Sequence, residues 1–407
     1  MTEAYIVATA RSPIGRAHKG SLKGLRSDDL AARMVQAAVD RVPGLDPHRI
    51  EDIILGCGLP GGYQGSNLAR IVSVLLGWDG VPGTTVTRYC SSSLQSTRMA
   101  FHAIKADEGD AFISAGVESV SGMAVGSSDM IPGVDLTNPA FREAIARTQS
   151  RSIADAPQWT DPRLEGALPD PYIAMGETAE NVAALHGITR EEQDAFAARS
   201  QQRAERAIVD GFWARDITPV TLPDGTVVSS DDGPRAGTTT EKLATLDPVF
   251  RPDGTVTAGN ACPLNDGAAA VVIVSGRLVD ELGLEPLARI VSTGVSGLSP
   301  EIMGLGPVDA SRSALARAGL TVDDMDLVEI NEAFAAQVLP SARELGVDED
   351  RLNVHGGAIA VGHPFGMTGA RITSTLLTGL ATTGGRYGLE TMCVGGGQGM
   401  AMVLERL

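Results

Sequence analysis

Short apolar runs alternate with amphipathic stretches at the start of the chain. Tyr5–Ala10 and Ile50–Leu55 have the length and apolar character of buried strands. Ser27–Val42 is predicted to be a helix, because apolar residues recur on one face and two aspartates lie near its start. Asn67–Leu76 is predicted to be a second helix. This alternation predicts a layered α/β domain with a mixed or parallel sheet.

The stretch Thr84–Gly116 combines a strand, a turn, a helix and a second strand. It opens with the β-branched run Thr84–Thr87, which is typical of a buried strand end. The helix that follows has an apolar face formed by Leu94, Phe101 and Ile104. Gly109 is its expected end, and Ala111–Ala115 is the second strand.

Cys90 lies between that first strand and the first turn of the helix. Free backbone N–H groups and the helix dipole at such a position stabilise a thiolate. Cys90 is therefore a candidate nucleophile, although most lone cysteines are buried and inert.

The regular pattern then breaks down. Glycine, serine, proline and aspartate are scattered through Gly122–Pro139, and only Pro139–Ser152 and Thr189–Asp210 are firmly predicted as helices. So long an irregular insertion is usually functional. Regular α/β texture returns with the predicted strands Asp266–Val274, Ala288–Gly294 and Leu327–Ile330 and the predicted helix Ser311–Gly319.

An internal repeat relates the two ends of the chain. Asp52 lies 38 residues before Cys90, and Asp326 lies 37 residues before His363. Each half then continues with a helix and a strand that ends in a glycine-rich turn. Any two α/β halves share some likeness, but the matched spacing favours a duplicated unit. In such a duplication Cys90 and His363 are pseudo-symmetry mates.

Composition limits the function classes. The chain has 407 residues, 43% of them hydrophobic, so we expect two or three domains with ample core. A net charge of −17 argues against nucleic acid or an anionic membrane as the main partner. The start of the chain does not resemble a signal peptide, and no apolar run is long enough to span a membrane. The four cysteines lack paired spacing, which favours reduced thiols in the cytoplasm over disulfides or zinc.

Three further clusters could carry chemistry. Asn331 follows the predicted strand Leu327–Ile330, where α/β sheets commonly place ligands, although Asn-Glu there could also be a helix cap. His363 stands between a glycine and a proline, which fix an unusual backbone. Cys393 opens a glycine-rich run whose N–H groups could bind an anion. Two cysteines and a histidine suggest a nucleophile, its base and a second thiol for another proton transfer.

Taken together, these motifs closely resemble those of the thiolases, the acetyl-CoA acyltransferases, and the resemblance covers essentially the whole length of the chain. The motifs that carry the resemblance are VTRYCSSSLQ around Cys90, MGETAENVA from Met175, GTVTAGNACPLNDGAAA from Gly254, NEAFA from Asn331, GGAIAVGHPFGMTGAR from Gly356 and CVGGGQGMA from Cys393.

The resemblance implies a duplicated αβαβα, five-layered fold with an inserted loop domain. We therefore expect an N-terminal half at residues 1–119, completed by about 265–284. A CoA-binding loop domain would span 120–264, and a C-terminal half 285–407.

The resemblance also implies roles for the candidate residues. Cys90 would be acylated by a 3-ketoacyl-CoA after His363 takes its proton. His363 and a water held by Asn331 would bind the oxyanion of the incoming thioester. Cys393 would protonate the acetyl-CoA carbanion in cleavage or remove the α-proton in condensation. The N–H groups of Cys90 and Gly395 would bind the oxyanion of the acyl-enzyme's tetrahedral intermediates.

The same resemblance places the CoA contacts. Met175 and Phe334 would line the pantetheine tunnel, Ala258 and Phe250 would flank the chain, and Arg235 would meet the nucleotide. Coenzyme A would be a substrate, with no metal or other cofactor. A homodimer or homotetramer is implied, and a β-oxidation partner subunit is a possible further partner.

Three alternatives remain open. The leading hypothesis is thiolytic cleavage of the fatty-acid β-oxidation type, and the nearest rival is a biosynthetic acetoacetyl-CoA thiolase. Ala174 stands where biosynthetic enzymes tend to carry histidine, which favours the degradative type only weakly. Cys262 replaces a serine usual near the pantetheine. A non-catalytic CoA-binding scaffold subunit is a third hypothesis, against which the presence of all four candidate residues argues.

Overall fold

The computed structural model describes residues 2–123, 137–154 and 156–407 of the chain. Most of the irregular segment expected at Gly122–Pro139 lies outside the described residues. Among the described residues, no helix is long and apolar enough to cross a membrane.

The strands are β1 Ala4–Arg11, β2 Gly15–Arg16, β3 Asp52–Cys57, β4 Gly83–Val86, β5 Ala111–Ser119, β6 Val220–Thr221, β7 Val227–Val228, β8 Asn265–Ser275, β9 Ala288–Gly297, β10 Leu327–Ile330, β11 Tyr387–Val394 and β12 Gln398–Arg406. The helices are α1 Ser27–Val39, α2 Leu68–Leu75, α3 Ser92–Lys105, α4 Arg142–Gln149, α5 Met175–His186, α6 Arg190–Val209, α7 Phe212–Asp216, α8 Thr240–Leu243, α9 Gly276–Leu282, α10 Gly306–Ala318, α11 Ala335–Leu345, α12 Ala358–Val361 and α13 Thr368–Thr383.

The strand order shows the duplication directly. The main sheet runs β10-β11-β12-β9-β1-β8-β5-β3-β4, and β1 meets β9 at the centre through only two residue pairs. Outward from that junction, β1-β8-β5-β3 and β9-β12-β11-β10 have the same sequence of partners. In each half the first three strands are antiparallel and the last pair is parallel. β4 extends the first half as an edge strand.

Alternation along the strands sorts the side chains into layers. In β8, Val271 and Ile273 belong to a core that also contains residues of α3 and α13. Val272 and Val274 point the other way, into a core shared with α1 and α2. A third core packs α10 and α11 against the outer face of the second half. The first core thus combines strand residues of both halves with α3 and α13, and the two outer cores hold α1 with α2 and α10 with α11, which gives the αβαβα arrangement.

Some local predictions hold and others are wrong. The helix predicted from Thr189 is confirmed as α6, and Thr189 forms a capping box with Glu192 at its start. However, α3 ends at Lys105, short of Gly109. β4 was expected to be buried and is only half-buried, because it is an edge strand. The helix expected from Ser311 begins earlier, at Gly306, where a proline occupies one of its first positions.

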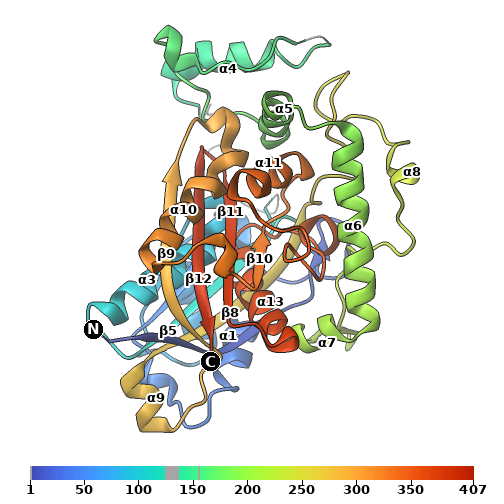
Figure 1. Ribbon diagram of the computed structural model, residues 1–407. Coiled ribbons are helices and arrows are strands. Elements are labelled where there is room, and N and C mark those ends of the chain that lie inside the picture. Colours follow the sequence, from blue (N-terminus) through green and yellow to red (C-terminus); the bar gives the residue numbers. More distant parts are fainter. Residues whose placement is uncertain (1, 124–136, 155) are drawn as a thin grey trace.

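The segment between β5 and β8 contributes elements outside the main sheet, of which α6 is the longest helix. It contains α4–α8 and the two-stranded ribbon β6–β7. In Figure 1, α4 and α5 lie over one end of the layered body, and α6 runs along its side. The chain then returns to the sheet as β8, between β1 and β5.

Candidate active site

Cys90 lies in a short 3₁₀ turn, Tyr89–Ser91, between β4 and α3. Tyr89 has a φ of 43°, a left-handed conformation that residues with side chains adopt rarely and at a cost. The hydroxyl of Ser92 donates to the carbonyl oxygen of Tyr89 at 2.6 Å and closes the turn. Cys90 is partly exposed, whereas Cys393 is buried. The strained turn therefore presents the Cys90 thiol at the end of β4.

The electrostatic setting of Cys90 corrects the sequence-based expectation. Desolvation of the sulfur raises the pKa of Cys90 to about 11, while the backbone N–H groups of Gly395 and of Cys90 itself lower it. The prediction of a stabilised thiolate is therefore wrong for the resting protein, because desolvation outweighs these N–H groups. The thiol keeps its proton at neutral pH, and a base must remove it.

His363 lies in the loop between α12 and α13 and is 1% exposed. The preceding Gly362 has a φ of 113°, a backbone conformation that favours glycine. The side-chain oxygen of Asn265, which packs against Gly362, accepts a hydrogen bond from the backbone N–H of His363 at 2.9 Å. In the imidazole, Nδ1 lies 2.6 Å from Oγ1 of Thr368. Burial, and secondly the charge of Arg371, lower the pKa of His363 to about 3. The resting imidazole is therefore neutral.

Asn331 directly follows β10, and its side-chain amide contacts the imidazole of His363. Its Nδ2 atom lies 3.2 Å from Nε2 of His363. Gln337 donates to its backbone carbonyl oxygen at 2.8 Å and anchors the strand end. The Oδ1 atom of Asn331 is buried and has no hydrogen-bond partner among the described residues. A buried acceptor of this kind calls for a donor such as a water molecule.

Cys393 is the next-to-last residue of β11 and is fully buried. A turn of three glycines, Gly395–Gly397, joins β11 to β12, and its last two members have φ near 80°. Burial, followed by the charges of Cys90 and Cys262, raises the pKa of Cys393 well above its usual value. Three thiols therefore share one region, with Cys262 held by its backbone N–H to the Ala333 carbonyl oxygen at 3.0 Å.

Glu118 is a residue of this region that sequence reasoning missed. It is the next-to-last residue of β5, is fully buried, and accepts the N–H groups of Gly58 and Gly366, each at 2.8 Å. Gln64 donates to its other oxygen at 2.5 Å. Glu118 thereby ties the end of β3 to the loop that carries His363. The sequence offered one signal for it: Glu118 follows the predicted strand Ala111–Ala115 and Gly116, where a polar side chain can emerge at a strand end.

Three of the expected CoA contacts lie beside these residues. Met175 begins α5, and its Sδ atom would lie 3.7 Å from a Cβ placed on Gly395. Phe250 packs so closely on Gly176 that a Cβ there would lie 2.1 Å from its ring. The rings of Phe250 and Phe334 meet edge to face, with centroids 6.3 Å apart. An apolar wall therefore runs from Gly395 outward.

The other two expected CoA contacts, Arg235 and Ala258, line one pocket. Arg16 and Gln201 also line it, and Gln201 accepts the backbone N–H of Arg235 at 2.8 Å. Partial burial, and secondly the charge of Arg16, lower the pKa of Arg235. Two guanidinium groups beside one pocket repel each other and would be stabilised by a bound anion.

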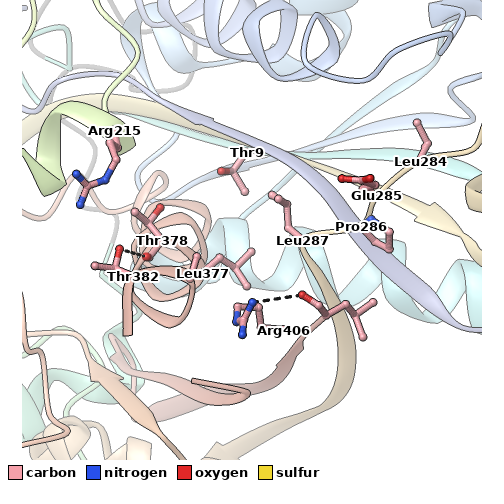
Figure 2. Close-up of a pocket in the computed structure, with 12 residues that line it drawn as sticks. Thr9, Arg215, Leu284, Glu285, Pro286, Leu287, Leu377, Thr378, Thr382 and Arg406 are labelled. Atoms are coloured by element: carbon pink, nitrogen blue, oxygen red, sulfur yellow. Dashed lines mark hydrogen bonds between the residues drawn. The ribbon is translucent and has the colours of Figure 1, made fainter. Parts of the chain in front are cut away.

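A separate cavity of about 760 Å³ shares none of these residues. Figure 2 shows Arg215, Leu377 and Arg406 around it, near the start of the second half and the end of the chain. The described residues contain no group of three or more His, Cys, Asp or Glu that could hold a metal ion. The candidate residues Cys90, Cys393, His363 and Asn331 supply two thiols, one imidazole and one amide, beside backbone N–H groups.

The chain is similar over its whole length to proteins of one family. Residues 4–277 match the family model "Thiolase, N-terminal domain", and residues 284–406 match "Thiolase, C-terminal domain". The chain is 42% identical to a β-ketoadipyl-CoA thiolase of Acinetobacter baylyi and 41% identical to a 3-ketoacyl-CoA thiolase of Bacillus subtilis, each over the full length of both chains. A crystal structure of human mitochondrial 3-ketoacyl-CoA thiolase in complex with CoA superimposes with a TM-score of 0.85 at 37% identity, covering 100% of this chain and 98% of that one. The chain belongs to the thiolase family of acyltransferases.

Proposed function

We propose that the protein cleaves 3-ketoacyl-CoA with coenzyme A, yielding acetyl-CoA and a shortened acyl-CoA, in a reaction that can also run as a Claisen condensation. The observation that carries the proposal is the meeting of residues from both halves. The N–H of Gly395, in the second half, reaches the sulfur of Cys90, in the first half. Within the second half, Asn331 contacts the imidazole of His363. The loop that carries His363 is tied through Glu118 to the half that carries Cys90.

In the first step, Nε2 of His363 takes the proton of Cys90, and the sulfur attacks the 3-keto carbon. The N–H groups of Cys90 and Gly395 stabilise the resulting oxyanion. The bond between C2 and C3 then breaks, which leaves an acyl group on Cys90 and the enolate of acetyl-CoA. His363 and a water on Asn331 stabilise that enolate, and Cys393 gives its proton to the carbon.

In the second step, the thiol of a new CoA returns a proton to Cys393, and its sulfur attacks the acyl-enzyme. Acyl-CoA leaves, and Cys90 recovers its proton from His363. The raised pKa of Cys393 supports its role, because an acid for an enolate must still hold its proton at neutral pH.

The CoA site is proposed along the wall formed by Met175, Phe250 and Phe334, with Ala258 beside the chain. Arg235 would meet the nucleotide phosphates. This placement is supported by the electrostatic repulsion between Arg235 and Arg16, which line the same pocket and which a bound anion would stabilise. The division into halves at 1–119 and 285–407 with a loop domain at 120–264 also stays a proposal, as do the cytoplasmic location and the absence of a metal or further cofactor.

A homodimer or homotetramer is the proposed assembly. The half-buried edge strand β4 supports it, because an open edge can pair with a second copy. The exposed apolar residues Val74 and Leu75 lie on the neighbouring α2 and would be covered by such pairing. A β-oxidation partner subunit remains a further proposal.

A second substrate class is favoured by the names of several relatives. Proteins of Acinetobacter baylyi and Escherichia coli at 42–44% identity are β-ketoadipyl-CoA thiolases, whose substrate carries a terminal carboxylate. We therefore propose two candidate substrates, a plain 3-ketoacyl-CoA and 3-oxoadipyl-CoA.

Steady-state thiolysis tests the proposal. Plain 3-ketoacyl-CoAs of increasing chain length and 3-oxoadipyl-CoA would be compared, with Cys90→Ala as the control. We expect cleavage by the wild-type protein and none by the variant. Equal activity in the variant would refute the assignment of the nucleophile, and no cleavage of any substrate would favour the scaffold hypothesis. A higher kcat/KM for one substrate class decides between the two candidates.

A further inference from the structure

The hydroxyl of Thr368 makes two short contacts that together determine where its proton lies. Thr368 is the first residue of α13. Its Oγ1 is 2.7 Å from the carbonyl oxygen of Pro364, which lies four residues earlier in the preceding loop. It is also 2.6 Å from Nδ1 of His363. Both Thr368 and His363 are essentially buried, so solvent does not compete for either contact.

A hydroxyl has one hydrogen to donate, and a carbonyl oxygen can only accept. The Thr368 hydrogen is therefore donated to Pro364, and the contact with the imidazole uses a lone pair of Oγ1. Nδ1 of His363 must then carry the hydrogen, which leaves Nε2 as an unprotonated acceptor.

The contact with Asn331 does not decide between the tautomers. Nδ2 of Asn331 lies 3.2 Å from Nε2 and 3.5 Å from Nδ1 of His363, so it sits against the side of the ring between the two nitrogens and is not in line with the lone pair of Nε2. The orientation with Oδ1 turned away also leaves that atom without a partner among the described residues, free to accept from a water molecule.

We infer that Thr368 is a positioning residue that holds His363 as the Nδ1–H tautomer, with Nε2 ready to accept the proton of Cys90. The inference rests on the proposed function for its catalytic consequence, but the tautomer itself is a property of the resting protein. Without the hydroxyl, Nδ1 has no acceptor, so the ring can turn or carry its hydrogen on Nε2, and a neutral imidazole of that form has no lone pair on Nε2 to accept the proton of Cys90.

The test combines a spectroscopic and a kinetic measurement on the full chain. Long-range ¹H–¹⁵N NMR of ¹⁵N-histidine protein, with His363→Asn for assignment, reports which ring nitrogen carries the hydrogen. We expect Nδ1–H in the wild type and loss of that uniform state in Thr368→Val. The rate of Cys90 acylation should fall by about 10- to 100-fold in Thr368→Val, a part of what a general base contributes. Thr368→Ser, which keeps the hydroxyl, should restore both readouts.

Thr382→Val is the matched control, because Thr382 lies on the same helix and its hydroxyl donates to Thr378 in the same way, at 2.7 Å, away from His363. An Nε2–H signal in the wild type overturns the inference even if no variant folds. An unchanged tautomer and acylation rate in Thr368→Val also overturn it. Absence of thiolysis together with an Nδ1–H signal would instead refute the proposed function alone.

Discussion

The amide of Asn331 and the imidazole of His363 lie 3.2 Å apart although 32 residues separate them. Asn331 directly follows β10, and His363 precedes α13, so the sheet and the central helix layer of the second half meet at this contact. Cys90 occupies the corresponding place before α3 in the first half. The duplication thus brings one loop from each half to the same edge of the layered body, and the two loops differ in chemistry.

Cys393→Ala should separate the two parts of the reaction. Without the buried thiol the enolate has no proton donor, so cleavage and condensation should fall by at least about 10²-fold. Transfer of an acetyl group from acetyl-CoA to Cys90 needs no carbon acid and should persist. Mass spectrometry of the protein after mixing with acetyl-CoA would measure the acyl-enzyme, with Cys90→Ala as the blank. Loss of acylation together with cleavage would contradict the division of roles.

The alkylation of Cys90 should depend steeply on pH. Because its pKa is raised to about 11, the reactive thiolate is rare at pH 7 and becomes more abundant as pH rises. The rate with iodoacetamide should increase about tenfold per pH unit from 7 to 9 without a plateau. Peptide mapping would separate Cys90 from the other three cysteines. A plateau near neutral pH would instead indicate a preformed thiolate–imidazolium pair.

Arg235→Ala should weaken CoA binding and leave the chemistry intact. A hydrogen bond to a charged group contributes about 1.5–3 kcal/mol, so the KM for CoA should rise about 10- to 100-fold with little change in kcat. Arg163→Ala is a suitable control, because Arg163 is an exposed arginine that does not line the Arg16–Arg235 pocket. Added salt should reduce the difference between wild type and variant, since screening weakens exposed charges. An unchanged KM would place the nucleotide elsewhere.

Glu390→Gln should make stability less dependent on pH. Burial raises the pKa of Glu390 to about 8, and one carboxylate oxygen has no partner among the described residues. Between about pH 4.5 and 8 the folded protein therefore binds a proton that the unfolded chain has lost, so stability falls as pH rises through this window. The glutamine cannot ionise, so the variant should melt higher than the wild type at pH 8.

The melting temperature at pH 5 and pH 8 measures this effect. For a chain of 407 residues, a gain of about 1 °C in melting temperature per kcal/mol of stabilisation is expected at pH 8, with little difference at pH 5. Glu108→Gln, at an exposed position, is the control and should change neither value. If the melting temperature changed equally between pH 5 and pH 8 in Glu390→Gln and in the wild type, Glu390 would be ionised in the folded protein.

Much of the architecture was predictable because it depends on local pattern. Apolar periodicity located many of the strands and helices, and the closely matched spacings of 38 residues from Asp52 to Cys90 and 37 from Asp326 to His363 indicated the duplication. Element ends were less predictable. The half-buried state of β4 depends on its place at the edge of the sheet, and α10 begins ahead of Ser311 because the chain turns at Gly306.

The roles of Cys90, His363, Cys393 and Asn331 stay predictions, although the structure places these residues in one region. The protonation of Cys90 could not be read from its position in sequence. A helix start favours a thiolate, but the degree of desolvation of the sulfur decides its pKa. Desolvation depends on segments of the same chain that lie hundreds of residues away in sequence.

By itself, the sequence determined the periodic elements, the duplicated unit and the residue types capable of thiol chemistry. Only the tertiary structure decided that Glu118 clamps the loop of His363, that Thr368 faces Nδ1, and that Arg16 faces the same pocket as Arg235. The reason is physical. Periodicity depends on neighbours a few residues apart, whereas hydrogen-bond direction, desolvation and charge repulsion act between atoms that only the packed fold brings together.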